Sequence, residues 1–278
     1  MPKPMPNSIC KLSHALALTL LVWSGSSSLS HAAPPDATAP HDEIEKPQKA
    51  ALAAHNGMAL VNTLPATFDP EQRAVAIALG GADSSSKTGI ARLVGDVRLF
   101  GPLDLRLGLT YLSDVDVGQN QFEPVIGLRL RILQQQHHGI DLATALFYRR
   151  DRYTSDEGMI QLNVAVARRF DRLGLFANLA YGQDPEGDDR DGDAALAALY
   201  EVALPFQVGV EGHVRFDLAS DDPDREERRQ GPLDVQVGPV IHYALGPALL
   251  IAEAGVSAYR FERTRTGVYA IGGVGGVY

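Results

Sequence analysis

Charged side chains recur at every second position along several stretches of this 278-residue chain. In Phe206–Leu218, FQVGVEGHVRFDL, the polar series contains Glu211, His213, Arg215 and Asp217, and the positions between them are apolar or small. A strand places alternate side chains on opposite faces, so these groups share one face. Cations and carboxylates on one enclosed face could form salt bridges that stabilise a wall, or could filter ions in an aqueous pore.

The same alternation places further charged groups on a polar face that we expect to be enclosed. The candidate site residues are Asp96, Arg98, Asp104, Arg106, Arg129, Arg131, Asp141, Arg169, Glu201, Glu211, His213, Arg215, His242 and Glu253. All except Glu211, His213, Arg215 and Glu253 are expected near one end of the strands. Salt bridges are the first expectation, because a buried charge requires a partner. A mixed-charge constriction of a narrow pore is the second, and the near balance of signs predicts weak ion selectivity.

Two groups of residues could bind a metal ion, and for both a simpler interpretation is preferred. His213 and His242 fall on the polar face of neighbouring strands, where a hydrogen-bonded histidine is the commoner case. The run Gln183–Asp193, QDPEGDDRDGD, is acidic enough for Ca²⁺. However, Gly187 and Ala198 stand where an EF-hand loop needs its first ligand and its closing glutamate. We expect a solvated loop, and no metal or other cofactor.

No familiar enzyme motif occurs in the sequence. GxSxG, HExxH and a phosphate-binding glycine loop are absent, and no outward-facing serine accompanies a histidine. The run Gly272–Gly276, GGVGG, is followed by no helix and indicates close strand packing. Ser220–Gly231 carries Arg225, Arg228 and Arg229, which could touch lipopolysaccharide phosphates, although a mobile loop tip is the simpler expectation. We therefore expect no catalytic residues.

Twelve strands are predicted to position the charged groups. Alternation is clearest in 103–113, where leucines and a tyrosine alternate with Asp104, Arg106, Gly108 and Thr110. Pro124 and Pro239 fall inside predicted strands, where they count against the strand or mark bulges or local breaks in pairing. The first, eighth, eleventh and twelfth strands are rich in Ala and Gly, so their registers are weakly specified. The predicted strands lie near 73–80, 88–100, 103–113, 122–134, 139–149, 158–170, 173–182, 193–204, 206–219, 232–244, 248–261 and 266–278.

Short and long connections alternate along the chain. The short ones lie at 101–102, 135–138, 171–172, 205 and 246–247, and the long polar ones at 81–87, 114–121, 150–157, 183–192, 220–231 and 262–265. Outer-membrane barrels have short periplasmic turns, longer extracellular loops and strands of about 9–11 residues. The sequence therefore predicts an all-β fold: a single antiparallel up-and-down transmembrane β-barrel of about 12 strands, wide enough inside for a cavity or channel.

The residues before the barrel fall into two segments. Residues 1–32 have the features of a secretory signal peptide: Lys3 and Lys11, the apolar Ala15–Trp23, and a small-x-small cleavage site at Ser30–Ala32. Residues 33–70 are rich in Pro, Ala and charge, and we expect a flexible periplasmic segment, with a plug inside the barrel as the alternative. The barrel is assigned to residues 71–278. The formal charge of −9 argues against nucleic acid as a partner.

Aromatic residues mark both ends of the predicted strands. Two aromatic bands suit the two headgroup zones of a membrane. The outer band is Tyr111, Tyr148, Tyr181, Phe216 and Phe261, and the inner band is Phe100, Phe170, Phe206, Tyr243 and Tyr278.

With its signal peptide, its alternation, its rhythm of turns and its terminal Tyr278, the chain resembles bacterial outer-membrane β-barrel proteins. In that class the last strand usually ends in an aromatic residue that the barrel-assembly machinery reads. The resemblance therefore implies that machinery and outer-membrane lipids as partners, and a Gram-negative outer membrane as the location, with periplasmic termini. It implies a small, weakly selective porin-like channel or a structural wall protein.

Two alternative functions stay open from the sequence. One is an outer-membrane enzyme that modifies lipid or lipopolysaccharide, with a catalytic group near the outer rim around 181–193. The other is an exported soluble β-barrel that binds a small ligand in its interior. The sequence specifies neither a transported solute nor an oligomeric state.

Overall fold

A computed structural model describes residues 74–114, 120–150, 158–187, 189–203, 205–219, 233–245, 248–260 and 263–277. Nearly all of these residues belong to strands, and the described part contains one short helix. In chain order the elements are β1 (Ala74–Asp83), β2 (Thr88–Phe100), β3 (Leu103–Asp114), β4 (Asn120–Leu133), α3 (Gln135–His138), β5 (Asp141–Arg149), β6 (Met159–Phe170), β7 (Leu173–Gln183), β8 (Arg190–Ala203), β9 (Phe206–Ala219), β10 (Leu233–Leu245), β11 (Ala248–Arg260) and β12 (Thr264–Val277).

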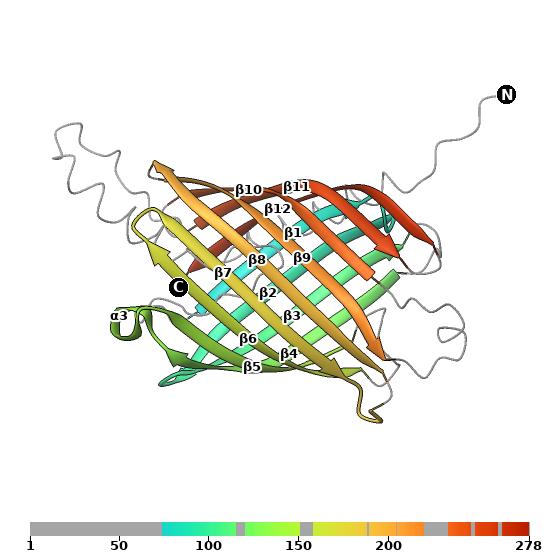
Figure 1. The fold of residues 1–278 in the computed structure, drawn as a ribbon, viewed down its shortest axis with the longest axis horizontal. Helices are drawn as coiled ribbons and strands as arrows, with labels where there is room; N and C mark the ends of the chain where they lie inside the picture. Colours follow the sequence, from blue (N-terminus) through green and yellow to red (C-terminus); the bar gives the residue numbers. More distant parts are fainter. Residues whose placement is uncertain are drawn as a thin grey trace, which may run out of the picture.

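The strands form one closed antiparallel barrel (Figure 1). Each strand pairs with its neighbours in sequence, and β12 pairs with β1, from Val277 opposite Val75 to Tyr269 opposite Asp83. The predicted fold class is confirmed, and β2 and β9 have the predicted bounds. The structure contains no helix, in the described ranges, that is long and apolar enough to cross a membrane.

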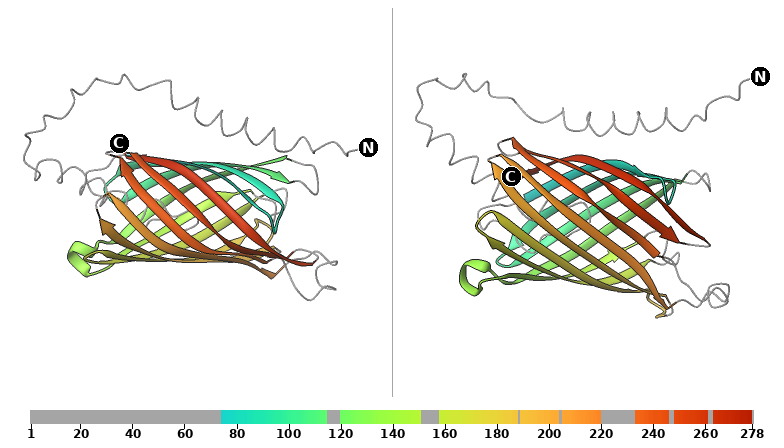
Figure 2. Two further views of the ribbon diagram at one scale, coloured as in Figure 1. Left: turned by 90° about the horizontal axis from the view of Figure 1, so that it is seen from above. Right: turned by 45° about the horizontal axis from the view of Figure 1, so that its top comes forward.

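The two ends of the barrel differ in their connections, as the sequence predicts. Figures 1 and 2 show α3 at the same end of the barrel as the C-terminus, and the strand bounds leave mostly longer connections at the opposite end. At the short-turn end, carbonyl groups of the turns extend the pairing of the next strand. The Pro102 carbonyl accepts from Arg131 N–H at 2.9 Å, and the Arg172 carbonyl accepts from Glu201 N–H at 2.8 Å. These bonds satisfy backbone groups at the rim.

Both strand prolines lie where the missing N–H removes little pairing. The Pro124 carbonyl accepts from Arg150 N–H, just beyond the last residue of β5, so its hydrogen-bonding edge faces the point where that strand ends. Pro239 is paired with Val210 of β9, but the pairing of β10 with β11 is interrupted at Gly238 and Pro239. The expected local break is therefore present at Pro239.

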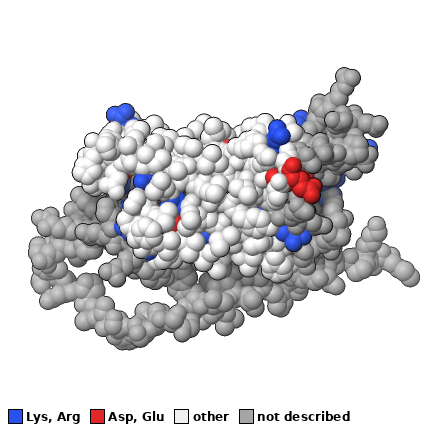
Figure 3. Space-filling model, turned by 90° about the horizontal axis from the view of Figure 1, so that it is seen from below, with Lys and Arg blue, Asp and Glu red and all other residues white. Residues whose placement is uncertain are grey.

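The outer face of the barrel is an apolar belt. Alternate residues of each strand, such as Leu93, Leu107, Ile126 and Leu196, expose large hydrophobic side chains. In Figure 3 uncharged atoms cover most of the visible wall, and charged side chains gather toward its ends. Soluble proteins rarely expose a continuous apolar surface of this extent, whereas a barrel wall in a bilayer requires one. The alternation therefore has its apolar side outward.

Aromatic rings lie at both margins of this belt. Phe100, Phe170 and Tyr243 are exposed near the short-turn end, and Tyr148 and Tyr181 are exposed near the other end. Tyr111 packs on Phe122 with ring centroids 5.1 Å apart. The predicted positions Phe261 and Tyr278 lie outside the described residues. These exposed rings are placed as the two aromatic girdles of an outer-membrane barrel would be.

Candidate functional site

The inner face of the barrel carries the charged groups. The structure places each candidate site residue on this face. Asp96, Asp104, Arg106, Arg129, Arg131, Asp141, Glu211, His242 and Glu253 are buried, and Arg98, Arg169, Glu201, His213 and Arg215 are half-buried. They do not form one ring, because the register of the strands separates them into groups that are described in turn.

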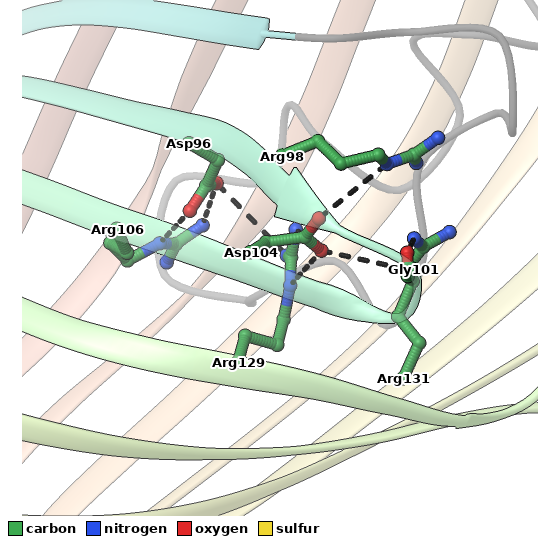
Figure 4. A network of polar contacts seen from close by, with 7 residues as sticks. All are labelled: Asp96, Arg98, Gly101, Asp104, Arg106, Arg129 and Arg131. Atoms are coloured by element: carbon green, nitrogen blue, oxygen red, sulfur yellow. Dashed lines mark hydrogen bonds and ion pairs between the residues drawn. The ribbon is translucent and has the colours of Figure 1, made fainter.

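The largest group is the Asp104 network, formed by Asp96, Arg98, Asp104, Arg106, Arg129 and Arg131 of β2–β4 (Figure 4). Arg106 holds Asp96 with two bonds, Nε to Oδ1 at 2.8 Å and Nη2 to Oδ2 at 2.6 Å. Asp104 accepts from Arg129 Nη2 at 3.1 Å and lies 3.5 Å from Arg131 Nε. The bidentate geometry of the first pair gives both orientation and strength.

Direct cross-strand pairing builds this network. Asp96 lies opposite Arg106 between β2 and β3, and Asp104 lies opposite Arg129 between β3 and β4. Opposed side chains on one face lie close enough to interact directly. Arg131 also donates to the Gly101 carbonyl at 2.6 Å, which ties the network to the turn between β2 and β3. Four guanidinium groups meet two carboxylates, so this wall has an excess of two positive charges.

Four other predicted residues near the short turns stay outside the network: His242, described below, and Asp141, Arg169 and Glu201. The Asp141 carboxylate accepts from Gln135 N–H at 2.8 Å. The Gln135 side chain in turn bonds both backbone groups of Arg169, at 2.7 Å each. Glu201 contributes its backbone N–H to the Arg172 carbonyl. The contacts of Gln135 fasten α3 to the rim, a part that the sequence did not predict for this residue.

A second charged group lies in the half of the barrel that carries the long connections. The Asp191 carboxylate binds Arg149 and also accepts from Arg215 Nη2 at 2.6 Å. The His213 ring Nε2 lies 2.8 Å from Asp193 Oδ2. Asp191 and Asp193 are absent from the candidate residues: Asp191 falls in the predicted connection 183–192, and Asp193 is the first residue of the predicted strand. β8 instead begins at Arg190, so both carboxylates lie within the strand and share its inward face with Ala195 and Ala197.

The second group lines a cavity of about 250 Å³. This volume has room for roughly eight waters at ~30 Å³ each, or for one small solute. Five arginines face three carboxylates and a histidine around it. The charged lining comprises Arg92, Arg106, Arg149, Arg150, Arg215, Glu123, Asp193, Asp234 and His213. Arg106 is paired with Asp96, and Arg149 and Arg215 share Asp191, so two carboxylates just outside the lining balance the excess of arginines.

Buried acids on the wall formed by β9–β12 and β1 are paired with hydroxyl and amide groups. Tyr269 donates its hydroxyl to Glu253. The Asp83 carboxylate accepts from the Ser257 hydroxyl at 2.7 Å and from the Gln236 amide at 2.9 Å. These partners lie far apart in sequence and were not predicted. Asp83 and Glu253 are thus held by hydroxyl and amide groups of this wall.

The two predicted histidines do not meet. His213 lies opposite Gln236 between β9 and β10, whereas His242 lies opposite Gln207, six residues further along each strand. No group of three or more potential metal ligands occurs among the described residues. In the acidic run, the Asp184 carboxylate accepts from Gly187 N–H at 2.8 Å and from Asp189 N–H at 3.2 Å. Its Oδ1 is thus engaged by the loop's own backbone.

The inner face of the barrel also has an apolar region, in the half near the short turns. It includes Phe176, Leu199, Val240, Leu249 and Ile251, all buried and all in one cluster. Outward neighbours such as Leu250 and Tyr200 are apolar as well. β8 and β11 are therefore apolar on both faces here, which the search for alternation did not reveal. Ser220–Gly231, with its three arginines, lies in a range that the structure leaves undescribed.

No protein-family model matches the chain, and no curated protein matches its sequence. Among solved structures the chain is similar to the NanC porin, with a TM-score of 0.53 and 11% sequence identity, over 72% of this chain and 98% of that one. The KdgM porin aligns with a TM-score of 0.48, at 9% identity over 73% and 99% of the two chains. LpxR from Salmonella typhimurium aligns with a TM-score of 0.45, at 8% identity over 74% and 100%. The similarity to the NanC porin shows a shared barrel fold alone. The TM-scores of the other two structures are below 0.5 and support no conclusion.

Proposed function

We propose that this chain is an outer-membrane pore that passes small solutes through its lumen. One observation carries the proposal: a closed twelve-stranded wall with an apolar outer belt encloses a charged cavity of about 250 Å³. An apolar exterior and a charged interior suit a water-filled passage across a bilayer. The fold likeness to the NanC porin supports the proposal at the level of architecture.

The same proposal covers location and assembly. β1 begins and β12 ends at the short-turn end of the barrel. Short turns face the periplasm in this class, so both chain termini would lie in the periplasm. Export by residues 1–32, a periplasmic segment at 33–70 and recognition of the strand that ends at Tyr278 by the barrel-assembly machinery belong to the proposal. The proposal also holds that the barrel is not an enzyme.

Planar bilayers test the pore. Purified protein should produce ohmic conductance steps in KCl, and the protein should fractionate with outer membranes and migrate differently on gels before and after heating. A bilayer that stays sealed at all voltages, with protein that shows the folded gel band, would remove the pore and leave a structural wall protein. Altered lipid profiles on expression would instead favour the alternative function, an enzyme that modifies lipid or lipopolysaccharide.

Two adjacent substitutions make the test specific to the lumen. Ala197 points inward and is buried, while Leu196 points outward and is 67% exposed. Ala197→Trp adds bulk to the passage and should lower the unitary conductance, because the side chain must occupy luminal volume. Leu196→Trp places the same ring in the lipid-facing belt and should leave the conductance unchanged. Equal conductance in both variants would show that ions do not pass through this lumen.

A further inference from the structure

We infer that the uncharged part of the N-terminal segment, residues 50–68, seats inside the barrel against the apolar region of the inner face and narrows the short-turn half of the lumen. The inference rests on the proposed pore and refines its periplasmic segment. Residues 33–49 stay in the periplasm, and residues 50–68 enter the lumen from that side. Residues 50–68 lie outside the described ranges, whereas the wall that they would cover is described.

The apolar region is covered, although it faces the inside of a wide barrel. Val240, Leu249 and Leu199 belong to it, and their exposures are 0%, 1% and 2%. Barrels of about eight strands are filled by their own inward side chains, and twelve strands enclose more space. None of these three residues lines the described cavity. Other atoms must therefore occupy the lumen in front of them.

The neighbouring strands supply little of this cover. Leu199 and Val240 both lie opposite Gly209, and Leu249 lies opposite Gly275. A Cβ at Gly209 would lie 2.6 Å from Leu199 Cδ2, so this leucine leans over the glycine. Leaning covers one flank of a side chain and leaves open the side that faces the lumen. The cover is therefore assigned to a part of the chain outside the described ranges.

One undescribed range is both correctly placed and long enough to supply the cover. At the short-turn end the undescribed ranges are 204, 246–247, 278 and the residues before β1. The other undescribed ranges lie in connections at the opposite end. After removal of the signal peptide, the range before β1 still comprises residues 33–73. It ends at β1, which is two strands from Leu249 of β11 in the closed order.

The composition of this range suits an apolar interior over one run. Residues 50–68, AALAAHNGMALVNTLPATF, contain no Asp, Glu, Lys or Arg, whereas residues 33–49 are rich in charge. Apolar side chains gain free energy when they leave water for an apolar wall, and unpaired charges lose it. The link of residues 69–73 spans up to ~17 Å when extended. That length exceeds the depth of Leu249, which is the second residue of β11.

Thiol labelling tests the inference in the full mature chain, which has no native cysteine because Cys10 lies in the predicted signal peptide. The test compares Leu249→Cys alone with Leu249→Cys in a chain that also carries Leu60→Asp and Leu64→Asp. The two aspartates would set unpaired charges against the apolar region and so expel residues 50–68. A water-soluble maleimide should label the first chain at least about tenfold more slowly, because buried leucines add to the free energy of opening.

Two controls make this comparison specific. Ala37→Asp with Ala39→Asp adds the same two charges outside residues 50–68 and should leave the Leu249→Cys thiol slow. Gln161→Cys, in the described cavity, should react at one rate in every background. The folded gel band confirms that each variant folds. Equal rates for Leu249→Cys in all backgrounds would overturn the inference, since described side chains or a bound lipid would then cover the region.

Disulfide formation identifies the chain that supplies the segment. Cysteines placed in turn across residues 50–68, each combined with Leu249→Cys, should give at least one disulfide within a single chain. Disulfides that form only between two chains would assign the cover to a second copy and overturn the inference. The absence of a disulfide at every position would overturn it as well.

KCl conductance separates the seated segment from the pore. Unitary conductance should rise when Leu60→Asp and Leu64→Asp expel the segment, and an unchanged conductance would overturn the narrowing of the lumen. Conductance with equal labelling rates would leave the pore and remove the seated segment. A bilayer that stays sealed with both chains, while the difference in labelling persists, would remove the pore and support the seated segment.

Discussion

The Asp104 carboxylate offers the most direct test of how the lumen is held together. Its side chain is completely buried, and it lies within 4 Å of three guanidinium groups, those of Arg98, Arg129 and Arg131. Asp104→Asn keeps the shape of the side chain but removes its charge. Three buried or half-buried cations then lose their nearest anion. Removal of one partner from a buried pair typically costs ~3–5 kcal/mol, because the remaining charge is left uncompensated.

The expected loss of unfolding free energy is therefore at least ~3 kcal/mol, or more than a hundredfold in the unfolding equilibrium. The measurement is the intensity of the folded gel band as a function of urea concentration in detergent. Tryptophan fluorescence cannot follow the unfolding, because the only tryptophan is Trp23 in the predicted signal peptide. Glu186→Gln is the matched control: it removes one carboxylate from an exposed loop position and should change stability by ~0.5 kcal/mol or less.

A companion variant separates charge from packing. In the double variant Asp104→Asn with Arg129→Met, one uncompensated cation is removed together with the anion, so part of the loss should be recovered. The two sites are in contact, and an interaction energy of ~0.5–3 kcal/mol is the usual range for such pairs. A loss for Asp104→Asn below ~1 kcal/mol, the size found for exposed ion pairs, would refute the view that this network is shielded from water.

Three other substitutions probe the wall and the second charged group. Gly255→Ala should block folding or sharply destabilise the barrel, because the added Cβ would lie 2.6 Å from the Gly238 Cα; Gly272→Ala meets nothing closer than 3.7 Å and should fold, so similar yields of folded protein would contradict the close approach. Leu107→Arg, in the middle of an outward row, should cost ~2–4 kcal/mol in bilayer unfolding experiments, and Leu107→Ala much less. Asp191→Asn frees positive charge beside the cavity and should shift the KCl reversal potential toward anion selectivity, and an unchanged potential would show that the cavity is not on the ion path.

The sequence predicted the architecture because a barrel strand carries its two faces in a period of two. That signal persists over many residues, so β2 and β9 were bounded without error, and the largest difference elsewhere is three residues, at the end of β1 and the start of β8. The members of the Asp104 network were predicted to gather near one end of the strands, but their individual partners, such as Asp96 and Arg106, were not assigned.

The rest of the lumen depends on information that local patterns do not hold. Asp191 sits in a run whose acidic composition matches a loop, and it lies in the wall because β8 begins at Arg190, before the predicted strand. Asp83 meets Ser257 because the barrel closes, a contact that spans 174 residues. Leu199 and Leu249 have apolar neighbours on both faces, so no alternation marks them as luminal.

The joint between β1 and β12 has a mechanical consequence. Along it, Gly272, Gly273, Gly275 and Gly276 lie opposite Gly80, Leu79, Ile77 and Ala76. At least one residue in every such pair is a glycine, which has no side chain to pack across the strands. Backbone hydrogen bonds therefore provide most of the stabilisation along this joint. When the barrel is strained by heat or by lateral force from the bilayer, the pairing of β1 with β12 should separate first. This joint between the first and last strands is therefore where we expect the barrel to close during membrane insertion and to open during unfolding.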